Sequence, residues 1–394
     1  GITSSGADAY MLHVTTTPSV SYVTRTDEFD CGIMITASHN PYYDNGIKLI
    51  NRYGEKMDDA TTEFVEAYLD GNIKKLGIDG DDIPFAHRDG MGSIVDYVAG
   101  RNRYVGYLIS VASHSYKDLR IGLDCANGAS WMIAKAVFDA LGAKTYVIGA
   151  SPDGLNVNAG CGSTHIENLI EFVRENHLDA GFAFDGDADR CIAVDENGRI
   201  IDGDCILYIL GTRLKSRGTL DGDTVVATVM SNSGLFKAFE SAGIKYELTA
   251  VGDRFVYECM QKNGYKLGGE QSGHIILQKY ATTGDGLLTA IMLTEEMRDR
   301  KLPLSKLAEP VRLYPQTVKS IRVVSKEQTL SDPEVKAEFD AINKEINGNG
   351  RALLRASGTE PVVRIMLECE SEELCEKYTA RLLEAIHKRG YCCE

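Results

Sequence analysis

Residues 141–148 read Leu141-Gly142-Ala143-Lys144-Thr145-Tyr146-Val147-Ile148, and this stretch decides the fold. A glycine just past a helix favours the left-handed turn that ends it, and the apolar residues that follow have the length of a short strand. The same order recurs at Ser5-Gly6 and at Ala242-Gly243, each followed by a short apolar run. Three such units predict an α/β fold class with three similar α/β domains and mixed sheets.

Each unit is followed by a second apolar strand that ends in a polar loop. The three loops begin at Ser38, at Asp185 and at Gly268. In open α/β sheets, functional loops lie outside the carboxyl ends of the strands. We therefore expect these loops to contribute to one active site in a central cleft.

The last 80 or so residues have a different order and predict a smaller α+β C-terminal domain. We expect strands at 319–324 and 362–367, and helices at 334–346 and 372–387, with Ser331 as the N-cap of the first helix. No low-complexity linker separates the parts of the chain. The predicted domains are residues 1–107, 108–213, 214–307 and 308–394.

The composition is that of an ordinary globular protein. Of the 394 residues, 43% are hydrophobic and 25% are charged, which allows several cores. The net charge of -15, with no block of Lys and Arg, argues against nucleic acid and anionic membranes as partners. The ten cysteines form no CxxC pair, and no apolar run reaches the roughly 18 residues of a membrane span. We expect free thiols and a cytoplasmic location.

The run Gly32-Ile33-Met34-Ile35-Thr36-Ala37-Ser38-His39-Asn40-Pro41 ends a strand at a serine. Ser, Asn and Pro also gather at strand ends for conformational reasons alone, so a plain turn is the competing interpretation. The functional interpretation gains from His39, which could handle a proton, and from Lys48, which could neutralise a phosphate. Ser38 is therefore a candidate nucleophile.

Asp185, Asp187 and Asp189 supply three carboxylates at alternate positions after another apolar strand. An EF-hand loop would need glycine at its sixth position, where this chain has Arg190, and helices rather than strands on both sides. Three carboxylates in a compact loop need a counter-charge, and a divalent cation is a natural one. A nucleophilic serine and a magnesium site in one chain suggest phosphoryl transfer.

Two further loops offer groups that could hold a phosphorylated sugar. In Gly268-Gly269-Glu270-Gln271-Ser272-Gly273-His274, the polar residues Glu270, Ser272 and His274 alternate, so an extended segment would point all three to one side. A flexible glycine turn is the competing interpretation. In the second loop a guanidinium, two hydroxyls and a glycine amide would suit a phosphate dianion, although a polar hairpin turn fits equally: Arg355, Ser357, Gly358 and Thr359.

Taken in this order, the four loops resemble those of the α-D-phosphohexomutase family across the whole chain. Residues 36–41 are similar to its phosphoserine loop, 185–190 to its magnesium loop, 269–274 to its sugar loop and 355–359 to its phosphate loop. Gln271, where phosphomannomutases usually have Met, is similar to the phosphoglucosamine mutase subfamily. The resemblance implies an isomerase that interconverts glucosamine 6-phosphate and glucosamine 1-phosphate for cell-wall precursor synthesis.

The resemblance also implies a mechanism. Phosphorylated Ser38 would give its phosphoryl group to one sugar hydroxyl, the resulting 1,6-bisphosphate would turn over, and the other phosphate would return to Ser38. Mg²⁺ would be bound by a Ser38 phosphate oxygen and by Asp185, Asp187 and Asp189, with Arg190 adding positive charge. Glucosamine 1,6-bisphosphate or glucose 1,6-bisphosphate would act as the activator.

The remaining roles follow from the same resemblance. His39 and Lys48 would be the acid/base and electrostatic groups. The sugar would be bound by Glu270, Ser272 and His274. The phosphate would be bound by Arg355, Ser357, Gly358 and Thr359. A phosphosugar is thus the expected partner, and a homodimer is the assembly to test.

The chain departs from the family at its start. Members open with Gly-Thr-Asp-Gly-x-Arg-Gly and later carry Gly-Arg-Asp-x-Arg, and neither segment is found here. We expect that Gly1 falls inside the first domain, which would leave a sheet edge open. Three alternatives follow: a phosphoglucomutase/phosphomannomutase, a catalytically silent sugar-phosphate binding protein, and an aspartyl-phosphate hydrolase that uses Asp185 and Asp187.

Overall fold

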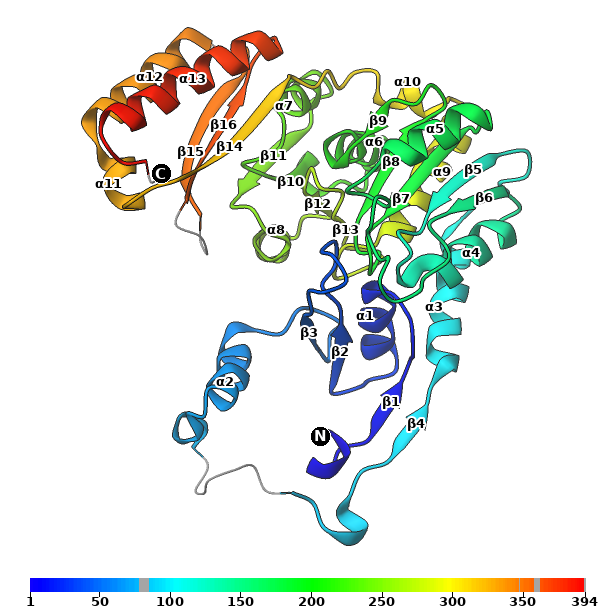
Figure 1. Ribbon diagram of the computed structural model, residues 1–394. Coiled ribbons are helices and arrows are strands. Elements are labelled where there is room, and N and C mark those ends of the chain that lie inside the picture. The colour runs from blue at the N-terminus through cyan, green and yellow to red at the C-terminus, as the bar shows by residue number, and fades with distance from the viewer. Residues whose placement is uncertain (78–84, 347, 358–361, 393–394) are drawn as a thin grey trace. The chain divides into compact units, whose positions relative to one another are not determined.

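Figure 1 shows the computed structural model of the chain. The structure describes residues 1–77, 85–346, 348–357 and 362–392. The chain divides into two compact units. Unit 1 comprises Gly1–Met230 and Gly243–Glu309, and unit 2 comprises Ser231–Ala242 and Pro310–Glu394.

The first α/β segment of unit 1 positions the predicted phosphoserine loop. Its strands are β1 (Ala9–Met11), β2 (Cys31–Ile35), β3 (Ile47–Asn51) and β4 (Ile94–Asp96), and its helices are α1 (Thr17–Thr26), α2 (Asp59–Leu69) and α3 (Val98–Val111). β1 pairs with β4 in parallel, and β2 pairs with β3 antiparallel. α1 begins where the Thr16 hydroxyl accepts a hydrogen bond from the Ser19 N–H at 3.2 Å. It packs on β2, where a Cβ on Gly32 would lie 3.0 Å from Val20.

The second segment holds a five-stranded mixed sheet of order β6-β5-β7-β8-β9. Its elements are β5 (Arg120–Asp124), α4 (Ala134–Ala140), β6 (Lys144–Ile148), α5 (Glu167–Glu175), β7 (Ala180–Phe184), β8 (Cys191–Asp195) and β9 (Ile200–Ile201). β5 is parallel to β6 and β7, whereas β8 is antiparallel to β7 and β9. α5 buries Leu169 and Val173, which lie one turn apart on one face. Every residue of β7 is buried, so the loop that starts at Asp185 leaves the sheet from its core.

The third segment forms a four-stranded sheet of order β11-β10-β12-β13. Its elements are α6 (Gly203–Ser216), β10 (Thr224–Thr228), β11 (Lys245–Thr249), α8 (Asp253–Asn263), β12 (Leu267–Gly269), β13 (Ile275–Leu277), α9 (Gly286–Arg300) and α10 (Leu304–Ala308). β10 is parallel to β11 and β12. β12 and β13 pair antiparallel around the predicted sugar loop.

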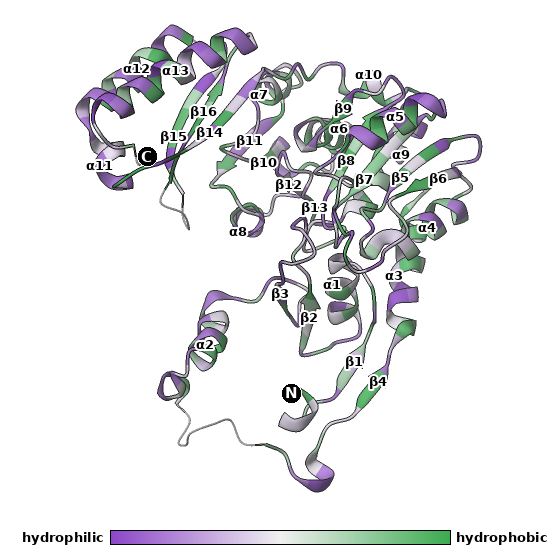
Figure 2. Ribbon diagram, in the orientation of Figure 1, coloured by the Kyte–Doolittle hydropathy of each residue, from purple (hydrophilic) through white to green (hydrophobic). Residues whose placement is uncertain are grey.

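Unit 2 packs helices on an antiparallel sheet of order β14-β16-β15. Its elements are α7 (Ser233–Ser241), β14 (Gln316–Arg322), α11 (Lys326–Ser331), α12 (Pro333–Ile346), β15 (Arg351–Ala356), β16 (Val362–Glu368) and α13 (Glu372–Lys388). Figure 2 shows hydrophilic and hydrophobic residues mixed along α12 and α13, as expected for helices with one apolar face. The core between sheet and helices includes Val335, Ile342, Val363, Ile365, Leu382 and Ile386.

Short 3-10 helices complete the described elements: η1 (Thr3–Ser5), η2 (Ile73–Leu76), η3 (Arg88–Gly90), η4 (Ala129–Met132) and η5 (Asp221–Asp223). The predicted fold class is confirmed: three α/β segments with mixed sheets precede an α+β segment. The glycines predicted to end helices, Gly6, Gly142 and Gly243, all have positive φ. The domain boundaries remain predictions.

The predicted N-cap Ser331 is wrong. Ser331 is the last residue of α11, and the next residue, Asp332, accepts hydrogen bonds from Glu334 N–H at 2.8 Å and Val335 N–H at 3.2 Å. A carboxylate followed by Pro333 is a better helix start than the serine before it, because proline suits the first turn.

Every described cysteine is a free thiol, as predicted. Within the described ranges, no helix has both the length and the apolar character needed to cross a lipid bilayer.

Candidate active site

The predicted nucleophile Ser38 lies in the loop that follows β2. Its backbone is left-handed, with φ of 56°, a conformation that a residue other than glycine keeps only when its surroundings hold it there. The Ser38 N–H donates a hydrogen bond to Thr36 Oγ1 at 2.9 Å. The Ser38 hydroxyl donates to Asp185 Oδ2 at 2.8 Å. The structure thus brings the predicted nucleophile against the first predicted metal ligand.

The three aspartates form a buried cluster. Asp185, Asp187 and Asp189 are 0%, 1% and 6% exposed. Each offers a carboxylate oxygen, and these oxygens all lie within 4.8 Å of one another. The turn between them is fixed by helix α9, whose Gly286 N–H donates to Ala188 O at 3.0 Å. As predicted, strands rather than helices flank this loop, which excludes an EF-hand.

Lys48 on β3 supplies a counter-charge to this cluster. Its ammonium donates to Asp187 Oδ2 at 2.6 Å and to Asp189 Oδ2 at 2.7 Å. Thr17, the first residue of α1, donates its hydroxyl to Asp187 Oδ2 at 2.5 Å. The sequence suggested that Lys48 neutralises a phosphate; in this structure it pairs with the acidic loop.

The charges of the cluster shift the pKa values of its members. Burial raises the pKa of Asp185 well above its ordinary value, and the carboxylates of Asp189 and Asp187 raise it further. Burial would lower the pKa of Lys48, but the same two carboxylates outweigh that effect and raise it. Lys48 is therefore a cation at neutral pH.

His39 and Arg190 lie on either side of the Ser38–Asp185 hydrogen bond. His39 Nδ1 is 3.5 Å from the Ser38 hydroxyl. Burial and the positive charge of Arg190 lower the pKa of His39, so its imidazole is neutral at pH 7 and can accept a proton. The Arg190 N–H donates to Asp185 Oδ1 at 3.2 Å, and its Nε lies 3.9 Å from Asp185 Oδ2.

The residues present fit a divalent cation. In the described part of the chain, no hydrogen-bond donor reaches the buried Oδ1 atoms of Asp187 and Asp189. A buried carboxylate oxygen without a partner is costly, and carboxylate oxygens are the ligands that Mg²⁺ prefers. The acidic loop can therefore hold a metal with oxygens that the protein leaves unpaired.

The predicted geometry of the sugar loop is wrong. We expected an extended segment with Glu270, Ser272 and His274 on one side. Instead Gly273 has φ of 90°, and its N–H donates to Glu270 O at 3.0 Å, so the segment is a turn. Ser272 is exposed, Glu270 is half-buried and His274 is only 4% exposed. A positive φ at one residue breaks the alternation on which the prediction depended.

The sugar loop is tied to the acidic loop through His274. The Nε2 atom of His274 accepts a hydrogen bond from Gly284 N–H at 3.0 Å, and its Nδ1 lies 3.7 Å from Asp189 Oδ1. Burial disfavours the charged imidazole, but Asp189 outweighs burial and raises the pKa of His274. Glu270 Oε1 accepts from Gly252 N–H at 2.9 Å. Both side chains hold loops in place in this structure.

The predicted phosphate loop belongs to unit 2. Arg355 is on β15. Ser357 is buried, and its N–H donates to Val362 O at 2.9 Å, which continues the β15–β16 pairing. Two further predicted residues lie outside the described residues: Gly358 and Thr359. The role of this loop stays a prediction.

Comparison with known proteins identifies the family. Models described as Phosphoglucomutase/phosphomannomutase alpha/beta/alpha domains I, II and III match residues 1–75, 102–198 and 202–314, and the C-terminal domain model matches 319–385. A phosphoglucosamine mutase from Lachnospira eligens is 60% identical over 391 residues, which cover 99% of this chain and 85% of that protein. This chain belongs to the phosphoglucomutase/phosphomannomutase family. The phosphoglucosamine mutase of Bacillus subtilis strain 168 is 46% identical over 386 residues, covering 98% and 85%.

Solved structures show that the fold is that of the family. A phosphoglucomutase/phosphomannomutase family protein from Burkholderia thailandensis superimposes with a TM-score of 0.77 at 22% identity, covering 98% of this chain and 84% of that one. An N-acetylphosphoglucosamine mutase from Aspergillus fumigatus gives 0.74 at 17% identity, covering 95% and 93%. The resemblance to phosphohexomutases is confirmed, and with it the enzyme class, an isomerase.

One cavity of unit 1 adjoins the loops of this phosphohexomutase. It measures about 390 Å³ and lies beside Arg190 and the sugar loop. Its polar lining offers hydroxyl, amide, guanidinium and carboxylate groups, which suit a polyhydroxylated ligand. These groups belong to Ser163, Thr164, Arg190, Asp202, Gln271 and Ser272.

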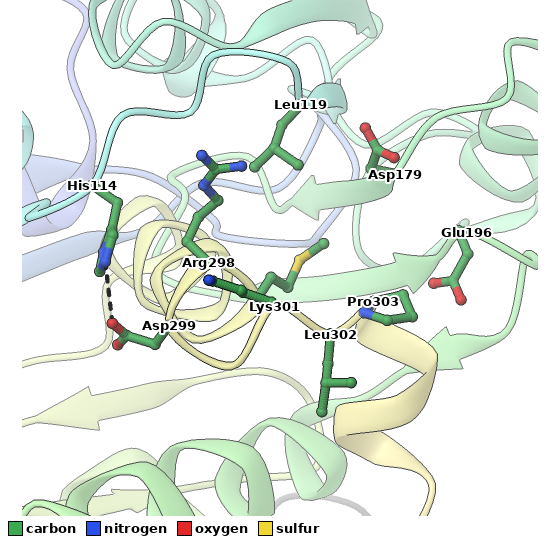
Figure 3. Close-up of a pocket in the computed structure, with 10 residues that line it drawn as sticks. His114, Leu119, Asp179, Glu196, Arg298, Asp299, Lys301, Leu302 and Pro303 are labelled. Atoms are coloured by element: carbon green, nitrogen blue, oxygen red, sulfur yellow. Dashed lines mark ion pairs between the residues drawn. The ribbon is translucent and has the colours of Figure 1, made fainter.

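A larger cavity of about 580 Å³ lies elsewhere in unit 1 (Figure 3). Leu119 and Asp179, which line it, directly precede β5 and β7, whereas Asp185 directly follows β7. The cavity is therefore at the amino ends of these strands. Ligands of open α/β sheets bind at the opposite, carboxyl ends, and none of the predicted site residues lines this cavity.

Two contacts of the site could not be read from the sequence. The Thr16-Thr17-Pro18 run signals a helix start, but it does not say that Thr17 would reach Asp187 far along the chain. His274 was singled out for contact with a sugar, and its burial behind Asp189 depends on the turn at Gly273. Both contacts depend on how separate α/β segments pack.

Proposed function

We propose that this chain is a phosphoglucosamine mutase, which interconverts glucosamine 6-phosphate and glucosamine 1-phosphate. The observation that carries the proposal is the Ser38 hydroxyl, held 2.8 Å from Asp185 within a cluster of three buried carboxylates. Relatives named phosphoglucosamine mutase, 46% to 60% identical, support this sugar. The Aspergillus fumigatus enzyme is known in complex with GlcNAc-6P and magnesium, which supports a phosphosugar and a metal.

The proposed reaction starts with a phosphoryl group on Ser38. The bond between phosphorus and Ser38 Oγ breaks as a bond forms between phosphorus and a sugar hydroxyl, which gives a 1,6-bisphosphate. His39, neutral at pH 7, takes the proton of that hydroxyl, and Ser38 Oγ takes up a proton. The bisphosphate turns over, and its other phosphoryl group returns to Ser38 by the reverse step.

Charge at the reacting phosphoryl group is balanced by Arg190, by Lys48 and by a metal. Bound magnesium, held by a Ser38 phosphate oxygen and by Asp185, Asp187 and Asp189, supplies positive charge that makes phosphorus more electrophilic. Glucosamine or glucose 1,6-bisphosphate rephosphorylates Ser38 when its phosphate is lost. A glucose 1,6-bisphosphate complex of an Aspergillus fumigatus N-acetylphosphoglucosamine mutase variant supports this kind of activator.

The sugar and its far phosphate require other groups. We assign the sugar hydroxyls to Glu270 and Ser272, with His274 holding their loop against Asp189. The far phosphate is assigned to Arg355, Ser357, Gly358 and Thr359. We further propose a cytoplasmic location and a homodimer; sedimentation equilibrium measures the mass of the assembly directly.

The first test is ³¹P NMR of the chain with Mg²⁺ and catalytic glucose 1,6-bisphosphate. Glucosamine 6-phosphate, glucose 6-phosphate and mannose 6-phosphate are supplied in separate tubes, with Ser38→Ala as the control. We expect the fastest conversion for glucosamine 6-phosphate and at least a thousandfold slower turnover by Ser38→Ala, because the covalent route needs Oγ. Faster conversion of glucose or mannose 6-phosphate would contradict the assignment of the sugar. Retained turnover in Ser38→Ala would contradict the phosphoserine itself.

A further inference from the structure

Asn158 reaches the nucleophile loop from the second α/β segment. It lies between β6 and α5 and is 6% exposed. Its Nδ2 donates hydrogen bonds to two carbonyl oxygens of the loop, Ser38 O at 2.9 Å and Asn40 O at 3.0 Å. Because both acceptors are carbonyls, only the amide nitrogen can face them. Asn158 therefore holds the backbone of the loop that carries Ser38.

The acidic loop encloses the same carbonyl from a second direction. A Cβ on Gly186 would lie 2.5 Å from Ser38 O and 3.1 Å from Asn158 Nδ2. The Ser38 carbonyl thus fits against a position that has room for glycine only. Ser38 has φ of 56°, and a strained backbone of this kind persists when its neighbours determine it from several sides.

We propose that Asn158 is a positioning residue for phosphoryl transfer: its two hydrogen bonds keep Ser38 left-handed, so that Oγ faces Asp185. The inference rests on the proposed function. Without these bonds Ser38 relaxes to a more ordinary φ, because the left-handed region is unfavourable for residues other than glycine. A changed φ redirects the Cα–Cβ bond and takes Oγ out of its 2.8 Å contact with Asp185.

Asn158→Asp is the variant that tests this role. Asn158 itself has φ of 57°, which Asp tolerates almost as well as Asn, so the variant keeps the shape and the backbone. An ionised carboxylate cannot donate to the two carbonyls and is repelled by them. We expect kcat for glucosamine 6-phosphate to fall roughly tenfold to a hundredfold with KM changed less than about threefold. Phosphorylation of Ser38 by glucose 1,6-bisphosphate, followed by intact mass, is expected to slow by the same factor.

The same loop offers a matched control. Asn156 donates to Ser151 O at 2.9 Å and accepts from Asp153 N–H at 3.1 Å, both within the loop. Asn156→Asp should therefore leave kcat and the phosphorylation rate within about twofold of wild type. If Asn158→Asp does not fold, Asn158→Gly decides, because glycine adopts the same φ and removes only the side chain.

Two results would overturn the inference. One is a lowered melting temperature of Asn158→Asp with kcat and Ser38 phosphorylation unchanged, which is what a purely structural asparagine would give. The other is a raised KM alone. The rate of Ser38 phosphorylation is measured without glucosamine 6-phosphate. A wild type that phosphorylates Ser38 but converts no hexose phosphate would count against the proposed function, while the Asn158→Asp comparison would still decide the inference.

Discussion

Lys48 occupies the place where metal binding would change the charge most. Its ammonium lies 2.6 Å from Asp187 and 2.7 Å from Asp189, two of the three carboxylates that fit a magnesium ion. A divalent cation bound there must share these oxygens with Lys48 or displace it. A lysine and a metal that use the same carboxylates compete for them.

We therefore expect Lys48→Met to bind Mg²⁺ more tightly and to turn over more slowly. Removal of the ammonium leaves the buried carboxylates with less positive charge, so the metal-free protein loses stability and added Mg²⁺ restores it. Calorimetric titration of unphosphorylated protein should give a Kd about tenfold lower than wild type. The rise in melting temperature on addition of Mg²⁺ should also exceed that of wild type.

Lys56→Met is the control for this prediction. Lys56 follows β3 and pairs with Asp253 at 3.3 Å, outside the acidic loop. Its removal should leave Mg²⁺ affinity unchanged, since an exposed ion pair contributes little. Weaker Mg²⁺ binding by Lys48→Met would mean that Lys48 and the metal use the carboxylates together.

Single residues were predicted where local chemistry decides their role. A serine at a strand end and three alternate aspartates declare themselves by type and spacing, and the structure brings Ser38 and Asp185 together. The partner of Lys48 could not be predicted, because an ammonium suits a phosphate and a carboxylate equally. The burial of His274 was missed because it depends on packing against Asp189 from another segment.

Helix α9 carries the acidic loop at its amino end. Its N-cap Asp285 accepts a hydrogen bond from Leu288 N–H at 2.9 Å, and Tyr104 of α3 donates its hydroxyl to the same carboxylate at 2.8 Å. Asp285 and Tyr104 are 2% and 1% exposed. Burial raises the pKa of Asp285 from 3.8 to about 6. A buried carboxylate thus joins two helices beneath the site.

This shift makes the stability of the fold depend on pH. The folded protein keeps the Asp285 proton up to about pH 6, whereas the unfolded chain loses it near pH 4. The folded state binds more protons in this window, so its stability falls as pH rises from about 4 to about 6 and then stays level. The shift corresponds to roughly 2 to 3 kcal/mol.

Asp285→Asn should remove this dependence while keeping the N-cap, because the amide oxygen still accepts from Leu288 N–H. Urea unfolding of wild type and variant at pH 4.5, 6 and 7.5 measures the difference. We expect the variant to gain about 2 kcal/mol relative to wild type between pH 4.5 and 7.5. An equal difference at all three pH values would show that Asp285 has an ordinary pKa.

Elements were predicted well where glycines and apolar runs mark them. Gly142 and Gly243 end helices with φ of 97° and 64°, and β6 and β11 follow as expected. The failures lie at turns whose conformation packing selects. A Cβ on Gly203 would lie 1.9 Å from Glu270 O, so α6 presses on the sugar loop. No local signal in the sequence of that loop reports this contact.

Unit 2 is assembled from two separate parts of the chain. The segment Ser231–Ala242, which contains α7, belongs with residues from Pro310 onward. Three contacts join the parts: Ser233 N–H donates to Glu368 Oε1 at 2.8 Å, Asn232 Nδ2 donates to Tyr314 O at 2.9 Å, and the Arg351 guanidinium donates to Ser231 O. Sequence order alone does not show this grouping, because local patterns carry no information on which distant segment a helix meets.

Glu368 should therefore stabilise unit 2 as a whole. It is fully buried on β16 and accepts from the first residue of α7. Glu368→Ala leaves the Ser233 N–H without its acceptor and the Arg351 guanidinium without a carboxylate 3.7 Å away. We expect a loss of about 2 kcal/mol, seen in hydrogen exchange as faster exchange of α7 peptides together with those of β14, β15 and β16.

The exposed neighbour Glu370 provides the control, because Glu370→Ala removes the same charge without a buried contact. Peptides of β5, β7 and β8, which belong to unit 1, should exchange at the wild-type rate in both variants. If Glu368→Ala accelerates exchange in β14 to β16 but leaves α7 unchanged, α7 does not unfold with the C-terminal sheet. Unit 2 would then open in parts, since a helix that shares a cooperative unit with a sheet must lose protection with it.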